Sequence, residues 1–233
     1  MYDIQHLQNI QQSQELQDAE YFLCKEDPYH WLTHWAFTMD EHDPEFPFKL
    51  FPEKEYLKII VAIWKKYKKF LVPKSRQMMY SWIMTALFLH DTQFNQARKN
   101  FFQSKKADDA DSLVARSKII WDHEPKFLKR YYNEDTKKWV ELVCNPQMNG
   151  AHVYNKLEIP AISSIIRGIP EGEEVVRSHT LSGLFMDEMA FQPEARGAYG
   201  ASLPALSNRG RFVGVSTAVG ETFFQELVFD KGE

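Results

Sequence analysis

The chain has 233 residues, enough to bury the core of one large domain. Hydrophobic residues make up 44% of the sequence and charged residues 26%, which is typical of a soluble globular protein. The net charge of −4 argues against a wholly basic nucleic-acid binder, so any contact with DNA must come from a local patch or another domain. Cys24 and Cys144 are far apart and no apolar run is long enough for a membrane span. We therefore expect a cytosolic protein without a cysteine-based zinc site.

The first 48 residues predict a small helical subdomain rich in aromatic side chains. Residues 1–20 are rich in glutamine, and their apolar residues have the spacing of a weak amphipathic or frayed helix. Trp31 and Trp35 share one helical face. We interpret that face as packing against the core rather than as a platform for stacking bases.

An acidic turn follows at residues 40–44. We interpret it as a solvated loop, with a metal site as the alternative. Pro44 and Pro47 mark the boundary to a core that we expect to span residues 49–233.

Strands and helices alternate along this core. We expect strands at residues 70–72, 100–103, 140–143, 153–159, 162–166, 181–187 and 211–215, and helices at 56–67, 81–89, 104–121 and 222–228. The pattern predicts an α/β fold, with a mostly parallel sheet flanked by helices on both faces and a ligand at the carboxyl ends of the strands. Strands 153–159 and 162–166 are expected to form a hairpin beside the core. Four lysines in residues 65–69 complement the dipole of the first helix, with a DNA contact as the alternative.

A polar loop at residues 74–81 is the first candidate site. Strand, loop and helix in this order allow backbone N–H groups and a helix N-terminus to hold phosphate. The loop has no glycine, and Tyr80 stands where the standard phosphate loop has lysine. Lys74 at the loop entrance can still reach the β- and γ-phosphates, because a phosphate-wrapping loop brings its two ends together. Ser81 offers a hydroxyl to Mg²⁺, and Arg76 a bidentate contact to phosphate.

Two further strand ends carry polar residues. An apolar run ends in Asp187 and Glu188; in P-loop ATPases the first such acid holds Mg²⁺ and the second polarises the attacking water. An acidic turn without a catalytic role is the alternative. Ser216 and Thr217 end the next strand, where hydroxyls can sense the γ-phosphate, or where they form a turn that leads into the last helix.

Together these segments resemble the N-terminal ATPase domain of the large terminase subunits of tailed bacteriophages, the motors that pump DNA into capsids. Residues 74–81 resemble that family's deviant Walker A motif, with lysine at the loop entrance and Tyr-Ser at its far end. Asp187-Glu188-Met-Ala-Phe resembles its Walker B motif, and Ser216-Thr217-Ala218 its coupling motif. The resemblance extends over residues 27–228.

The resemblance implies a RecA-like P-loop NTPase fold of the ASCE class that hydrolyses ATP with Mg²⁺. Glu188 would deprotonate the attacking water, and Asp187 would hold Mg²⁺ with Ser81. Arg76 would stabilise charge in cis and Arg177 would do so on a neighbouring subunit, with a surface ion pair to Glu173 or Glu174 as the alternative for Arg177. The nucleotide-binding residues would be Lys74, Ser75, Arg76, Gln77, Met78, Met79, Tyr80 and Ser81, and the coupling residues Ser216, Thr217 and Ala218.

The resemblance also implies partners and a location. The partners are double-stranded DNA, the portal protein, the terminase small subunit and further copies of the chain, which form a pentameric ring on the portal and are monomeric in isolation. The location is the host bacterial cytoplasm, on the procapsid portal, and not the mature virion or a membrane. The nuclease domain that usually follows is expected to be absent, either truncated or on another polypeptide, so no DNA cleavage is expected.

The sequence departs from the family pattern at Glu53, where a glutamine often reads adenine, and at Ser178, where glycine is common. Two alternatives remain. One is a helicase-like DNA-remodelling ATPase, which would need a second RecA-like domain and a standard Gly-Lys-Ser/Thr loop. The other is a catalytically decayed P-loop scaffold that binds packaging partners.

Overall fold

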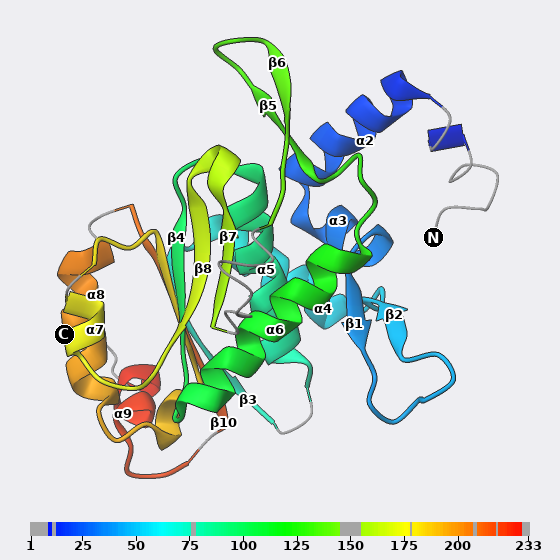
Figure 1. The fold of residues 1–233 in the computed structure, drawn as a ribbon. Coiled ribbons are helices and arrows are strands. Elements are labelled where there is room, and N and C mark those ends of the chain that lie inside the picture. Colours follow the sequence, from blue (N-terminus) through cyan, green and yellow to red (C-terminus); the bar gives the residue numbers. More distant parts are fainter. Residues whose placement is uncertain are drawn as a thin grey trace.

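A six-stranded sheet forms the centre of the computed structural model, which describes residues 9–10, 13–75, 78–144, 155–177, 179–206, 209–217 and 219–229 (Figure 1). Its strand order is β3-β10-β9-β4-β8-β7, and every pairing is parallel except that of β7 with β8. The predicted mostly parallel sheet is therefore confirmed. The strands are β3 (Lys69–Lys74), β4 (Lys99–Gln103), β7 (Lys156–Ile159), β8 (Ser164–Ile169), β9 (Gly183–Asp187) and β10 (Arg211–Thr217).

Helices cover both faces of this sheet (Figure 1). On one face lie α4 (Glu55–Lys66), α5 (Tyr80–Phe94) and α6 (Ala107–His123), and on the other α7 (Glu174–Arg177), α8 (Ala195–Leu206) and α9 (Phe223–Phe229). Successive side chains of a strand point to opposite faces, so each central strand contributes to both cores. In β9, Phe185 packs into the core under α5, and Leu184 and Met186 pack into the core under α8. This two-sided burial explains why the middle residues of the central strands are apolar on both faces.

The N-terminal elements pack against the first of these cores. They are α2 (Gln14–Glu26), α3 (Pro28–His34) and a two-stranded ribbon of β1 (Phe37–Met39) and β2 (Phe48–Leu50). Asp27 caps α3 by accepting a hydrogen bond from the Tyr29 N–H, and Pro28 occupies the first helical position. Trp31 is fully buried against Phe94 of α5, and Trp35 is 8% exposed, so the predicted packing role of both is confirmed.

The structure corrects several of the predicted strands. The strand predicted at 140–143 is β6 (Lys138–Glu141), which pairs with β5 (Arg130–Asn133) in a hairpin that projects from the main sheet (Figure 1). The start of the strand predicted at 162–166 is instead the end of a 3-10 turn, η1 (Pro160–Ile162). The predicted hairpin is confirmed as β7 and β8, which both belong to the main sheet.

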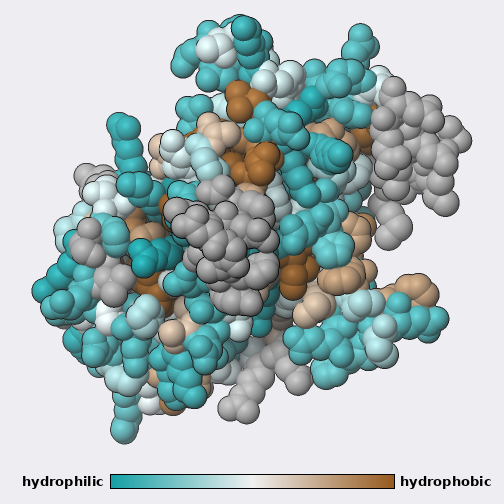
Figure 2. All heavy atoms as spheres, in the orientation of Figure 1, coloured by the Kyte–Doolittle hydropathy of each residue, from teal (hydrophilic) through white to brown (hydrophobic). Residues whose placement is uncertain are grey.

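The visible face of the molecule is mainly hydrophilic. Figure 2 shows hydrophobic residues only in small patches between hydrophilic ones. Among the described residues, no helix combines the length and apolar character that crossing a bilayer requires.

Candidate active site

The carboxyl ends of three adjacent strands bring the predicted site residues together. In the sheet β10 lies between β3 and β9, with Thr217 opposite Lys74 and Val215 opposite Asp187. All three strands run parallel, so their polar ends meet at one edge, where ligands bind in open α/β sheets. The order β3, loop, α5 is the strand–loop–helix arrangement that the sequence predicted.

Lys74 and Glu188 form the central contact of this edge. The Lys74 Nζ lies 2.7 Å from Glu188 Oε1, although the two residues are 114 positions apart in the sequence. The Lys74 side chain is 8% exposed and that of Glu188 is 35% exposed. A lysine at the loop entrance therefore points toward the acids rather than into solvent.

Ser81 and Asp187 form a second contact. The Ser81 hydroxyl, in the first turn of α5, donates to Asp187 Oδ2 at 2.8 Å. The other carboxylate oxygen, Oδ1, is buried and has no hydrogen-bond partner among the described residues. Carboxylate and hydroxyl oxygens are ligands that Mg²⁺ accepts, so an orphaned oxygen beside a serine hydroxyl fits a Mg²⁺ ion that arrives with a phosphate ligand.

The hydroxyls at the end of β10 hold Glu188 from the other side. Thr217 Oγ1 donates to Glu188 Oε2 at 3.2 Å, and Ser216 Oγ lies 3.5 Å from the same oxygen. Ser216 also accepts a hydrogen bond from the Ala190 N–H at 3.1 Å. Glu188 itself has φ 49° and ψ 44°, a left-handed conformation that non-glycine residues rarely adopt.

The two acids differ in electrostatics. Burial raises the pKa of Asp187 above its ordinary value; the Ser81 hydrogen bond opposes this effect and the charge of Glu188 adds to it. Burial also acts to raise the pKa of Glu188, but the hydrogen bond and charge of Lys74, together with Thr217, outweigh it and lower that pKa. Glu188 is therefore held as a carboxylate near neutral pH.

A cavity of about 510 Å³ opens beside these residues. Its strand-end wall is formed by Lys74, Asp187, Glu188 and Thr217, together with Phe191 of η2 (Met189–Phe191). Ser104 and Lys105, which follow β4, also line it, as does a face of α6 that carries Asp109, Ser112, Leu113 and Arg116. The size falls within the range of small-molecule sites.

Other predicted site residues lie elsewhere or outside the described residues. Ser75 and Met78 are exposed, while Met79 and Tyr80 are partly buried at the start of α5, where Met79 has φ 48°. Arg177 is 61% exposed on α7, pairs with Glu173 at 2.9 Å, and is not among the described residues that line the cavity. The three predicted residues outside the described part of the chain are Arg76, Gln77 and Ala218.

The sequence reasoning missed the contribution of α6 to the cavity. The helix was predicted, and its position after β4 places its first turns near the carboxyl edge of the sheet. Asp109, Ser112, Leu113 and Arg116 follow the three- and four-residue spacing of one helical face. That spacing predicts that the four residues share one face of the helix, but it does not show that the face lines a cavity.

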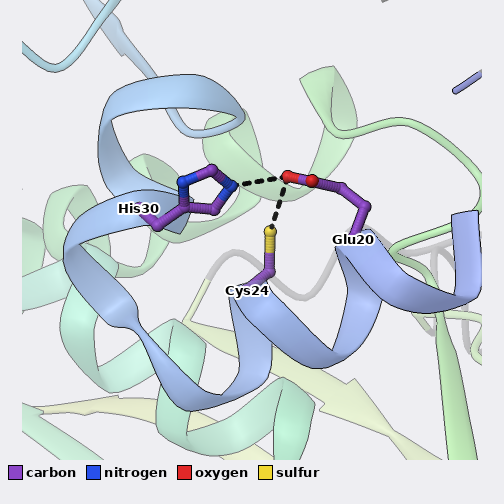
Figure 3. A group of neighbouring side chains, drawn as sticks. All are labelled: Glu20, Cys24 and His30. Carbon is purple, nitrogen blue, oxygen red and sulfur yellow. Dashed lines mark hydrogen bonds and ion pairs between the residues drawn. The ribbon is translucent and has the colours of Figure 1, made fainter. Parts of the chain in front are cut away.

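A second polar cluster lies between α2 and α3 (Figure 3). One oxygen of Glu20, Oε1, contacts His30 Nε2 at 2.6 Å, Trp35 Nε1 at 2.6 Å and Cys24 Sγ at 3.6 Å. The ligand atoms of Glu20, Cys24 and His30 lie within 4.8 Å of one another, as in a metal site. However, that oxygen already accepts three donors, and burial, with the charge of Glu20, raises the pKa of Cys24 well above its ordinary value. We interpret the cluster as a hydrogen-bonded anchor between two helices.

Comparison with solved structures identifies the fold. The large terminase of bacteriophage HK97 matches with a TM-score of 0.61 and 10% identity, over 88% of this chain and 40% of that chain. The large terminase ATPase domain of Thermus phage P74-26 matches with a TM-score of 0.51 and 15% identity, over 76% of this chain and 69% of that chain. No model of a known protein family matches the chain, and no curated protein sequence does. The chain therefore shares the fold of these large terminase ATPase domains, a sheet of mostly parallel strands flanked by helices.

Proposed function

We propose that this chain is an ATPase domain of the phage terminase type, which hydrolyses ATP to drive double-stranded DNA into a capsid. The observation that carries the proposal is the 2.7 Å contact between Lys74 and Glu188 beside the Ser81–Asp187 pair, at the carboxyl edge of a parallel sheet. Lys74 supplies a cation that binds phosphate, Ser81 and Asp187 supply two oxygen ligands for Mg²⁺, and Glu188 supplies a carboxylate that orients water. The fold of large terminase ATPase domains supports the same assignment.

The chemistry follows from these residues. Lys74 and the N-terminus of α5 bind the β- and γ-phosphates of ATP. Ser81 and Asp187 hold Mg²⁺, which neutralises charge on the phosphates when it is bound. Glu188, freed from Lys74 when the lysine turns to phosphate, orients the attacking water and accepts its proton.

Further roles complete the proposal. Ser75, Gln77, Met78, Met79 and Tyr80 form the rest of the phosphate loop with Arg76, which stabilises charge in cis. Arg177 acts on the nucleotide of a neighbouring subunit, and Ser216, Thr217 and Ala218 couple hydrolysis to movement. The partners are DNA, the portal protein, the small terminase subunit and further copies in a ring, at the procapsid portal in the host cytoplasm.

Substitution of Lys74 tests the proposal. We expect Lys74→Ala to weaken MgATP binding at least about tenfold, which corresponds to about 1.4 kcal/mol, and to abolish phosphate release. Isothermal titration measures the first effect and a phosphate assay the second. The control is Lys69→Ala, since Lys69 is an exposed lysine at the other end of the same strand.

The outcomes separate the motor from the scaffold. A wild-type protein that binds no MgATP, or a Lys74→Ala protein that binds it as well as the wild type, would favour a P-loop scaffold in which the Lys74–Glu188 contact is only structural. Equal losses for Lys69→Ala and Lys74→Ala would show that the effect does not depend on the position of Lys74 in the site.

A further inference from the structure

Two cations of the cavity, Lys105 and Arg116, have no role in the function proposed above; Lys105 is exposed, whereas Arg116 is partly buried. Arg116 lies on the α6 face that lines the cavity together with the strand ends that carry Lys74, Asp187 and Glu188. Asp109, Ser112, Leu113 and Arg116 are spaced by three or four residues, so the helix places all four side chains on one face, and that face lines the cavity.

The surroundings of Arg116 hold it in place without neutralising it. Its guanidinium lies 5.5 Å from the ring centroid of Trp82, the residue that follows Ser81 in α5. It forms no hydrogen bond or ion pair with any described residue. Burial lowers its pKa from the ordinary value, while the nearby carboxylates of Asp187 and Glu41 act in the opposite direction. The guanidinium nevertheless remains charged, since arginine is not deprotonated in proteins.

The pairing of individual charged groups in the cavity, and not their sum, leaves Arg116 available for an anion. The lining carries three cations, Lys74, Lys105 and Arg116, and three acids, Asp109, Asp187 and Glu188. Lys74 is already paired with Glu188, and Asp187 has Ser81 as its hydrogen-bond partner. A planar guanidinium with five N–H donors, held on an aromatic ring and without a carboxylate partner, suits bidentate contact with phosphate oxygens.

We propose that Arg116 is a phosphate-binding residue that contacts the terminal phosphate of a bound nucleoside triphosphate from the α6 side of the cavity. The inference rests on the proposed function, because that function places a triphosphate in this cavity. Arg116 lies near Asp187. In the proposed chemistry Asp187 holds Mg²⁺ and Glu188 orients the water that attacks the γ-phosphate, so a cation near Asp187 distinguishes a triphosphate from a diphosphate.

The test compares the affinities for ATP and ADP, each with Mg²⁺, of the wild type and three variants. Arg116→Ala removes the whole side chain, and Arg116→Gln removes the charge at similar length. The control is Lys106→Ala, which removes an exposed cation beside the start of α6 that does not line the cavity. Isothermal titration gives both affinities, and thermal unfolding shows whether each variant is folded.

We expect both Arg116 variants to lose at least about tenfold in ATP affinity and less than about threefold in ADP affinity, since only ATP carries the terminal phosphate. Lys106→Ala should change neither affinity. If Arg116→Ala does not fold, Arg116→Gln decides the question. ATP affinity within about twofold of the wild type in Arg116→Gln, or equal losses for ATP and ADP, would overturn the inference.

The two proposals fail in different ways. If the wild type binds ATP and Lys74→Ala does not, but the Arg116 variants match the wild type, the assignment of Arg116 is wrong and the proposed function stands. If the wild type binds neither nucleotide, both are wrong.

Discussion

Glu188 combines a strained backbone with an unusually well-held side chain. Its left-handed conformation, with φ 49°, costs about 1 to 3 kcal/mol relative to an ordinary conformation. The contacts to Lys74, Thr217 and Ser216 repay this cost by fixing the carboxylate between the ends of β3 and β10. Backbone strain at a residue that lines a cavity indicates a functional constraint on the position of its side chain.

Replacing this carboxylate should separate catalysis from binding. Glu188→Gln keeps the size and an acceptor oxygen for Thr217, but it cannot take a proton from water, and it releases Lys74 from its ion pair. We expect ATP hydrolysis to fall at least about 100-fold while MgATP affinity is unchanged or tighter. A phosphate-release assay and isothermal titration measure the two effects.

The matched control for this prediction is Glu141→Gln, an exposed acid at the end of β6 and outside the cavity, which should leave both quantities unchanged. Hydrolysis by Glu188→Gln at more than a tenth of the wild-type rate would remove Glu188 from the catalytic role.

At the scale of elements, Glu124 joins the end of α6 to α3 and α5. It is buried and accepts hydrogen bonds from Trp31 Nε1 at 2.6 Å and Gln93 Nε2 at 2.8 Å. Burial raises its pKa from 4.5 to about 7, against the opposing effects of Gln93 and Trp31. Between these pH values the folded carboxyl keeps a proton that the unfolded chain has lost. Its contribution to the free energy of unfolding therefore falls as the pH rises from 4.5 to 7, by roughly 3 kcal/mol.

His90 of α5 has the opposite effect on how the free energy of unfolding depends on pH. Burial lowers its pKa from 6.5 to about 4, so the folded imidazole stays neutral where the unfolded one binds a proton. The stability that this provides is present above pH 6.5 and is lost as the pH falls toward 4. In the overlapping pH range the contributions of Glu124 and His90 to the pH dependence cancel in part.

Glu124→Gln should therefore change how the free energy of unfolding depends on pH, and not only its value at a single pH. His90 is present in both proteins, so its effect is absent from the difference between them. We expect the wild-type free energy of unfolding, relative to that of the variant, to fall by roughly 3 kcal/mol between pH 4.5 and pH 7. Urea unfolding at four pH values across this range measures the difference. A difference that does not vary with pH would contradict the prediction, and Glu141→Gln should show no such trend.

The helices and strands that have a clear apolar pattern of their own could be predicted from the sequence. The helices α5 and α6 and the strands β3, β4, β9 and β10 lie within a few residues of their predicted positions, because each has a clear apolar pattern. The helix α8 was not predicted: Gly197, Gly200 and Pro204 lower its intrinsic helix propensity, and its contacts with β9 and β10 stabilise it instead.

The residues of the candidate site also divide into those that the sequence could predict and those that it could not. Lys74, Asp187 and Thr217 were identifiable because each stands at the end of a predicted strand or within two residues of it. Arg116 was not, because a cation on an amphipathic helix has the same sequence pattern whether it faces solvent or a cavity. The boundary near residue 48 remains a prediction, although α2 and α3 share one core with α5.

At the scale of the whole molecule, the order of the strands creates the site. The strands β9 and β10 come last in the chain but lie between β3 and β4. This arrangement places the end of β10 between Lys74 and the acids, so a hydroxyl that contacts Glu188 lies on a strand that also pairs with β3. A change in the occupancy of the cavity would therefore alter the contacts at the end of β10, the strand that precedes α9 in the chain.

The position of Arg177 makes a prediction about assembly. It lies on α7, which packs against α8, and its side chain is 61% exposed. Since Arg177 does not line the cavity of its own chain, any action on ATP must be on the cavity of another copy. We expect the ATPase rate per subunit to rise steeply with protein concentration, and Arg177→Ala to reduce the rate at high concentration at least about 100-fold. The matched control is Arg196→Ala, because Arg196 is an equally exposed, ion-paired arginine on α8. Rates per subunit that do not depend on concentration, or equal losses in the two variants, would show that Arg177 acts only as the surface partner of Glu173.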